Sequence, residues 1–219
     1  MLWHIWQRVQ QVQGLKQVLV ATDSVEVYRV VESWGGNVLM TSPDCHSGTE
    51  RIASVMDRLD ADCVLNVQGD EPLIDPRMLE DLVAAWSVVG GDLITPVFQI
   101  EAQSDLYNPN IVKVARGIDG RALYFSRSAI PFVRDLPPER WLERKIFWGH
   151  IGVYGYRKEV LMRYASLPES PLEKAESLEQ LRFLDSGFRI QTIETNYRSV
   201  AVDTYDDLEK VRQMFGQSS

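Results

Sequence analysis

Residues 63–86 read CVLNVQGDEPLIDPRMLEDLVAAW, and this stretch decides the fold class. Its apolar start, Cys63–Val67, is typical of a buried strand. After an acidic turn, Asp75 and Pro76 supply a helix N-cap and a proline in the first helical turn. Four apolar residues then recur at helical spacing: Leu79, Leu82, Val83 and Trp86. The stretch therefore predicts one strand–helix unit of an α/β protein.

The same alternation precedes this unit. The patterns predict strands at Gln17–Ala21 and Asn37–Met40, with a helix between them that begins at an Asp23 N-cap and ends at Gly35. A second helix carries apolar residues from Ile52 to Leu59. Successive strand–helix units predict a doubly wound, mostly parallel sheet of Rossmann-like α/β class.

From about residue 93 to 156 the pattern changes, because predicted strands follow one another with few helices between them. They lie at Leu93–Val97, Ile111–Val114, Leu123–Phe125 and Ile151–Tyr154. We interpret this part as an inserted β-rich lobe. Its stretch 130–148 is rich in Pro, Arg and aromatic residues, which suits a surface loop or a subunit contact.

The chain then returns to an α/β pattern. Helices are predicted near Glu173–Leu184 and Asp206–Phe215, with a strand at Phe188–Glu194 between them. The 219 residues are 45% hydrophobic and 25% charged, which predicts a single globular domain over residues 1–219.

Charge and composition exclude several classes of function. A net charge of -8 argues against a nucleic-acid-binding or anionic-membrane surface, because clustered Lys and Arg hold such partners. The presence of only two cysteines argues against a disulfide framework, and no signal segment leads the sequence. No apolar run reaches the roughly 18 residues that span a bilayer. We therefore expect a cytoplasmic protein without membrane insertion.

Two carboxylates follow apolar runs at positions where α/β sheets bind ligands. Asp70 lies in the turn after the strand that begins at Cys63, and Asp203 follows an apolar pair. Carboxylates placed this way can hold Mg²⁺ against nucleotide phosphates. An ordinary turn before Pro72 explains Asp70 as well, and a strand-to-helix turn explains Asp203. Thr204 with Asp207 predicts a capping box.

Three further stretches carry polar groups on otherwise apolar elements. Ser47 to Arg51 (SGTER) precedes a helix, so its amides and the Arg51 fork suit an anionic ligand, although helix capping explains its small residues equally well. His150 and Tyr154 share one face if they lie on one strand, where core packing is the alternative. Glu179 and Gln180 also fit a solvated helix edge.

Taken together, these stretches resemble the 3-deoxy-manno-octulosonate cytidylyltransferases, or CMP-Kdo synthetases. The resemblance runs from about Trp3 to Arg212. Its blocks are SGTER at 47–51, NVQGDEP at 66–72, NPNIVKV at 108–114, ALYFSRSAIP at 122–131, HIGVYGYR at 150–157, SPLEKAESLEQLR at 170–182 and VDTYDDLEKVR at 202–212. The family has a nucleotide-diphospho-sugar transferase-like fold and dimerises through its β-rich lobe, so the resemblance implies a homodimer.

The resemblance also implies roles for individual residues. Asp70 and Asp203 match the pair of Mg²⁺ ligands, and Gln68 matches a residue between base and sugar at the catalytic centre. The positions near the cytidine nucleotide are Ser47, Gly48, Thr49, Arg51, Gln68 and Gly69. The positions lining the pocket for 3-deoxy-manno-octulosonate (Kdo) are His150, Tyr154, Glu179 and Gln180.

The implied reaction transfers CMP from CTP to Kdo and releases pyrophosphate, which activates Kdo for lipopolysaccharide or related envelope glycans. An N-acylneuraminate cytidylyltransferase shares this chemistry and stays an alternative, although HIGVYGYR and LEQLR favour Kdo. An inactive chain that only dimerises or binds ligand is the second alternative. One departure is local: the family's His-x-Ser-Gly-Thr reads Cys45-His46-Ser47 here.

A second departure concerns the start of the sequence. Family members open with a strand and an Arg- and Lys-rich loop, on the order of thirty residues that have no counterpart before Met1. Without that strand we expect Val18, Val20, Val64 and Val67 to face water or a mismatched surface. Negligible activity, and poor expression or aggregation, are the corresponding expectations for these 219 residues.

Overall fold

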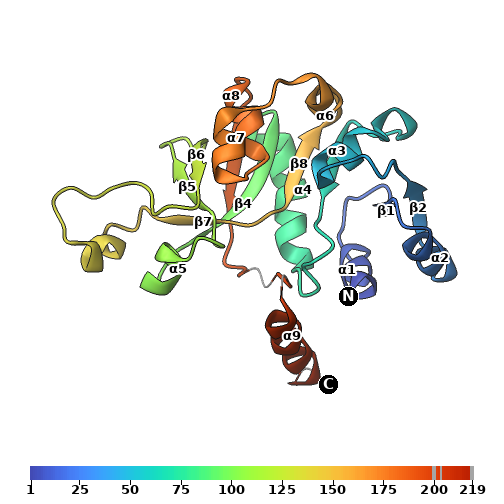
Figure 1. The fold of residues 1–219 in the computed structure, drawn as a ribbon, viewed down its shortest axis with the longest axis horizontal. Helices are drawn as coiled ribbons and strands as arrows, with labels where there is room; N and C mark the ends of the chain where they lie inside the picture. Colours follow the sequence, from blue (N-terminus) through green and yellow to red (C-terminus); the bar gives the residue numbers. More distant parts are fainter. Residues whose placement is uncertain (199–200, 203, 218–219) are drawn as a thin grey trace.

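The computed structural model describes residues 1–198, 201–202 and 204–217 (Figure 1). A seven-stranded mixed sheet occupies its centre, in the order β3-β8-β4-β7-β5-β6, with β9 paired to β4. The strands of this sheet are β3 (Cys63–Asn66), β4 (Leu93–Gln99), β5 (Lys113–Arg116), β6 (Ala122–Ser126), β7 (Trp148–His150), β8 (Tyr154–Arg157) and β9 (Ile190–Glu194). A separate parallel pair is formed by β1 (Leu19–Thr22) and β2 (Asn37–Met40).

Helices cover both faces of the central sheet. The α-helices are α1 (Leu2–Val9), α2 (Val25–Ser33), α3 (Gly48–Ala53), α4 (Pro76–Val89), α5 (Gln103–Tyr107), α6 (Lys158–Arg163), α7 (Pro171–Glu176), α8 (Gln180–Asp185) and α9 (Tyr205–Gln217). Short 3-10 helices span Met56–Arg58, Pro138–Arg144 and Tyr164–Ser166. None of the helices in the described part of the chain combines the length and apolar character needed to cross a bilayer.

The prediction of a mostly parallel sheet is wrong for strand pairing. In the central sheet, β4 pairs in parallel with β9, but β8 enters between β3 and β4 in the opposite direction. β7, β5 and β6 are also paired antiparallel. The repeated strand–helix pattern correctly predicts the parallel β1–β2 pair. It fails beyond residue 93 because a short apolar strand has the same pattern in either direction.

The stretch 93–156 is not a separate lobe. β4 and β8 lie within it, yet both belong to the centre of the sheet. In contrast, β5, β6, β7, α5 and the long connection 127–147 extend to the end of the molecule opposite β1 and β2 (Figure 1). The β5–β6 turn reaches back to β9, where the Thr192 amide donates to the Gly120 carbonyl over 3.0 Å. The lobe is therefore continuous with the sheet.

Helix ends explain most of the boundary differences. Asp75 caps α4 as predicted, with its side chain accepting from the Arg77 amide. Ser24, not Asp23, caps α2. The helix predicted over 173–184 is divided into α7 and α8, because Ser177 adopts a left-handed conformation with φ 53°. The Thr204–Asp207 capping box is confirmed by reciprocal hydrogen bonds.

Alternate residues of β4 face two different cores. Ile94 and Phe98 join a cluster with residues of α1 and α4, including Ile5 and Leu79. Leu93 and Val97 face the other way, toward a cluster that includes residues of β8 and α8. This second face also carries the residues of the candidate site.

The β1–β2 pair is less completely buried than the central strands. Within the described residues, β1 pairs only with β2, and β3 pairs only with β8. All four valines that were expected to face water or a mismatched surface are half-buried. Val18 and Val67 pack against the α1–α4 core, whereas Val64 packs against the opposite one.

Candidate functional site

Three turns converge around Gln68. A Cβ atom placed on Gly48 would lie 3.5 Å from Gln68 Oε1, and one on Gly152 would lie 3.8 Å from Gln68 Cγ. Asn66 Nδ2 also lies 3.9 Å from the Gly48 position. The fold therefore brings SGTER, NVQGDEP and HIGVYGYR together, although they are far apart in the sequence.

The turn before α3 is a helix cap as well as a wall of this site. Ser47 Oγ accepts from the Glu50 amide over 3.1 Å, and Glu50 Oε2 accepts from the His46 amide over 2.8 Å. Capping, the alternative interpretation of this turn, therefore accounts for the Ser47 hydroxyl. Thr49 is buried, and its hydroxyl lies 3.2 Å from the Tyr156 hydroxyl. Gly48 is the residue of the turn that borders Gln68.

Arg51 lies beside the carboxyl ends of β1 and β2. Its guanidinium donates to Thr41 Oγ1 and lies 3.3 Å from Asp23 Oδ1. Thr41 directly follows β2, and Asp23 directly follows β1. The contacts hold the Arg51 fork at the strand ends, where ligands of α/β sheets bind.

A row of rings runs along the face opposite α4. The His150 ring centroid lies 5.1 Å from those of Phe125 and Tyr154, and Tyr154 lies 5.6 Å from Tyr156. The prediction that His150 and Tyr154 share a face is confirmed, although they do not share a strand: His150 ends β7 and Tyr154 begins β8. The kink at 151–153 keeps both rings on one side.

Glu179 and Gln180 enter the site from the start of α8. Gln180 is 6% exposed, so the solvated-edge interpretation is wrong for this residue. Burial, and to a lesser extent the Glu179 charge, raises the pKa of both Tyr154 and Tyr156. Glu179 therefore lies close enough to act electrostatically on the row of rings.

The α7–α8 junction is fixed by charged hydrogen bonds. Glu176 accepts from the Ser126 hydroxyl and from the Arg127 amide, over 2.7 and 2.9 Å. The guanidinium of Arg127 donates to the Glu176 and Ser177 carbonyls. Arg182 and Glu173 add a bidentate pair with both contacts at 2.7 Å. These contacts hold the helix start that carries Glu179 and Gln180.

The ring row is electrically neutral near neutral pH. Loss of hydration on burial lowers the pKa of His150 to about 3. Burial also raises the pKa of Tyr154 well above its ordinary value, and burial with the nearby Glu179 charge raises that of Tyr164 to about 12. These side chains therefore offer neutral hydrogen-bonding tips on an apolar face.

Asp70 lies in the turn that follows β3. Its backbone carbonyl accepts from the Val202 amide over 2.9 Å, which brings the neighbour of Asp203 in sequence to this turn. Asp203 itself lies outside the described residues. Within those residues, no three His, Cys, Asp or Glu side chains form a metal-binding group. Mg²⁺ needs only one or two protein carboxylates, so Asp70 suits the ion chemically.

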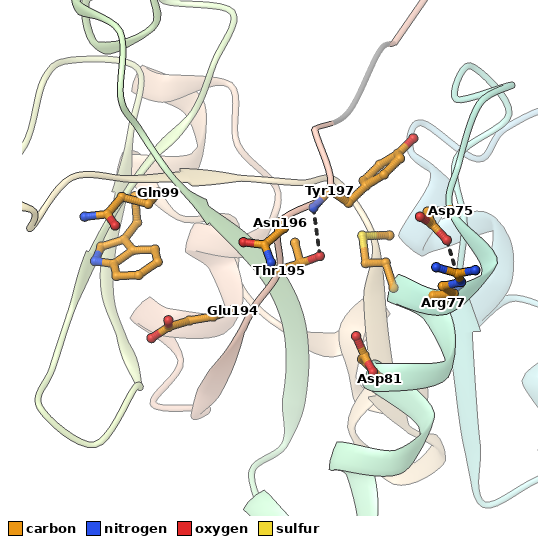
Figure 2. A pocket seen from close by; sticks show the side chains of 10 residues that line it. Asp75, Arg77, Asp81, Gln99, Glu194, Thr195, Asn196 and Tyr197 are labelled. Atoms are coloured by element: carbon orange, nitrogen blue, oxygen red, sulfur yellow. Dashed lines mark hydrogen bonds between the residues drawn. The ribbon is translucent and has the colours of Figure 1, made fainter.

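A cavity of about 510 Å³ lies near the ends of β4 and β9, and none of the predicted site residues lines it (Figure 2). Figure 2 shows Gln99 and Glu194 on one side and Asp75, Arg77 and Asp81 on the other. Three carboxylates against one guanidinium make the cavity acidic. This charge would repel a triphosphate or a sugar acid, so the cavity is a poor candidate for the substrate site.

Sequence reasoning missed Thr95, Tyr156 and Tyr164 as members of the site. Tyr156 was predictable, because it lies two residues after Tyr154 and residues two apart on a strand share one face. Thr95 and Tyr164 carry no such signal, since only the folded chain brings them to His150 and to the Ser47 turn.

Comparison with known proteins agrees with this arrangement. A family model described as Cytidylyltransferase matches residues 1–193. A 3-deoxy-manno-octulosonate cytidylyltransferase from Myxococcus xanthus is 45% identical over 218 residues, covering 98% of this chain and 85% of that protein. The chain belongs to the 3-deoxy-manno-octulosonate cytidylyltransferase family.

Solved structures support the family assignment. The structure of a CMP:2-keto-3-deoxy-manno-octonic acid synthetase complexed with CTP is 40% identical, with a TM-score of 0.91. The match covers all of this chain and 88% of that one. A putative glucose-1-phosphate thymidylyltransferase from Bacillus anthracis shares the fold at 13% identity, with a TM-score of 0.65 over 97% of this chain and 81% of that one. The family therefore has the fold of a wider group of nucleotidyltransferases.

Proposed function

We propose that this chain transfers CMP from CTP to Kdo, giving CMP-Kdo and pyrophosphate. The observation that carries the proposal is the convergence of Gly48, Gln68 and Gly152, because it joins three family motifs around one side chain. In this proposal the oxygen of the sugar's anomeric hydroxyl attacks the α-phosphorus of CTP. The bond to pyrophosphate breaks and the hydroxyl proton is released. No bond to the protein forms.

The nucleotide side of the site is proposed at the SGTER turn and Gln68. The Arg51 fork suits a phosphate or the carbonyl of a base, and its bonds to Thr41 and Asp23 fix its direction. Gly48 and Gly69 leave space for a ligand beside Gln68, because neither carries a side chain. Ser47 and Thr49 contribute through the shape of the turn, since their hydroxyls bond within the protein.

The sugar side is proposed at His150, Tyr154, Glu179 and Gln180. These residues offer a neutral ring nitrogen, a phenol, a carboxylate and an amide on one apolar face. Kdo has several hydroxyl groups, which such tips bind by donating and accepting hydrogen bonds. Rigid rings hold the sugar in one orientation, so positioning supplies much of the catalysis.

Asp70 and Asp203 are proposed to hold Mg²⁺. Bound there, the ion would neutralise phosphate charge that otherwise repels the attacking oxygen. The bond between the Val202 amide and the Asp70 carbonyl supports this pairing, because it joins the two motifs that carry the carboxylates. Asp70 and Gln68 both follow β3. This strand would therefore position both the carboxylate that binds the metal and the side chain between base and sugar.

The direct test is a product assay with CTP, Mg²⁺ and either Kdo or N-acetylneuraminate. We expect CMP-Kdo and an equal amount of pyrophosphate with Kdo, and no CMP-sugar with the other acid. Preferential use of N-acetylneuraminate would favour the alternative synthetase. Binding of both substrates, measured by calorimetry, without turnover would favour the inactive-chain alternative.

A homodimer through the β5–β7 end is also proposed. Four apolar side chains are exposed there: Ile118, Leu123, Phe132 and Ile146. Exposed apolar groups gathered at one end of a protein are typical of an association surface. Sedimentation equilibrium should give twice the chain mass, and Phe132→Asp should shift the population toward the monomer. A monomeric wild type at assay concentration would contradict this surface.

A further inference from the structure

Thr95 occupies a special position beneath the ring row. It lies in the middle of β4, with no exposed surface, and pairs with Thr192 of β9 through the backbone. Its Oγ1 lies 2.7 Å from the Val153 carbonyl oxygen, 3.3 Å from the Ile151 carbonyl oxygen and 2.9 Å from His150 Nε2. One buried hydroxyl therefore has three polar neighbours.

The two carbonyl groups reach Thr95 because the chain is kinked between β7 and β8. Within the kink, the Val153 amide bonds to the Ile151 carbonyl over 2.7 Å, so the regular ladder is interrupted. The Ile151 and Val153 carbonyls then accept from the Thr95 hydroxyl. The kink and the hydroxyl consequently form one unit.

The number of available protons determines the direction of the hydrogen bond between Thr95 and His150. A threonine hydroxyl has one proton, and both carbonyl oxygens can only accept. If that proton pointed to His150, the Thr95 oxygen would face the Val153 oxygen at 2.7 Å with no proton between them. The Thr95 proton therefore goes to a carbonyl, and His150 Nε2 carries the proton that it donates to Oγ1.

We propose that Thr95 is a positioning residue that holds His150 as its Nε2–H tautomer, so that Nδ1 is the ring atom that accepts a hydroxyl of the sugar substrate. Among the described residues, no protein group donates to Nδ1, whereas Nε2 is taken. Burial of the ring, which keeps it uncharged, agrees with this assignment. His150 would then recognise a hydroxyl of the sugar and not its carboxylate. The second half of the proposal rests on the proposed function.

The tautomer is tested on the whole chain without substrate. Nitrogen-15 spectra of the imidazole groups at neutral pH should show a protonated Nε2 and an unprotonated Nδ1 for His150, assigned by loss of the signals in His150→Gln. Thr95→Ser keeps the hydroxyl and should keep this pattern. Thr95→Val removes it and should give a mixture of tautomers. A wild-type ring protonated at Nδ1 would overturn the proposal.

The proposed contact between His150 Nδ1 and the sugar is tested separately. Adding Kdo to the labelled wild type should shift the His150 Nδ1 signal, because that lone pair accepts a proton donor. In steady-state assays Thr95→Val should raise KM for Kdo about tenfold, with KM for CTP little changed and Thr95→Ser close to wild type. Kdo binding without any Nδ1 shift would overturn this half. Absence of Kdo binding would refute the proposed function while the tautomer result stands.

Discussion

β4 and β1 are both short apolar strands, but their surroundings differ. β4 has strands on both edges and a core on each face, and most of its residues are buried. β1 pairs with β2 alone among the described residues, and three of its four residues are only half-buried. The proposed sugar side is built on the first region, and Arg51 lies beside the second. A substitution should therefore disturb folding more on the sugar side than near Arg51.

The largest effect on activity should come from Asp70→Asn. It removes one charge from the proposed metal site with little change in volume, so turnover should fall by about two orders of magnitude or more. Pyrophosphate release at saturating Kdo and CTP measures it. Asp81→Asn, in the acidic cavity, is the matched control and should be close to wild type. Equal losses in the two variants would point to the cavity as the site.

Substitution of two cationic side chains tests the difference in packing between the central sheet and the region near β1. Lys113 is fully buried, and its Nζ donates to the Asn108 and Ile111 carbonyls. Lys113→Ala would remove the Lys113 donor from the Ile111 carbonyl and leave the Asn108 carbonyl with the Ile111 amide as donor. It should lower the free energy of unfolding by about 3 kcal/mol. Arg51→Ala, in the half-exposed region, should lower it by less than about 1 kcal/mol. Urea unfolding of both variants would refute the contrast if their midpoints moved equally.

Several elements were predictable from the sequence, because their signals are local. The Asp75 cap, the Thr204 box and the strand ending at Asn66 each depend on a few neighbouring residues. The insertion of β8 between β3 and β4 was not predictable, since an apolar run does not encode its direction or its partners. Thr95 escaped notice for the same reason: nothing next to it in sequence marks its contact with His150.

The site residues were found through motifs and not through local pattern. Taken locally, the polar groups of His150 and Tyr154 on apolar strands fit core packing equally well. Only the family motifs taken together indicate a site. At the break at Ser177, Arg127 donates to the Glu176 and Ser177 carbonyls, and these bonds join positions about fifty residues apart. Such long-range contacts fix where Gln180 points, and no local rule contains them.

A smaller effect should appear in the pH dependence of stability. The pKa of His150 is lowered from 6.5 to about 3 in the folded chain. Between these pH values the unfolded chain binds more protons at His150 than the folded chain does. The contribution of His150 to the free energy of unfolding is therefore fully present above about pH 6.5. This contribution is lost as pH falls, by up to about 1.4 kcal/mol per pH unit.

His150→Gln should therefore flatten the fall of the melting temperature between neutral and mildly acidic pH. His46→Gln, at the exposed turn before α3, retains the His150 contribution and should keep the wild-type slope. Parallel slopes for wild type and His150→Gln would mean that folding does not lower the pKa of His150.

The most direct measurement of the division into a nucleotide side and a sugar side is a matrix of KM values for Arg51→Ala and Gln180→Ala. Each variant is assayed with Kdo varied at saturating CTP and with CTP varied at saturating Kdo. We predict that Arg51→Ala raises KM for CTP about tenfold and leaves that for Kdo nearly unchanged, and that Gln180→Ala does the reverse. If both variants raised the same KM, or each raised both equally, the two-sided site would be contradicted.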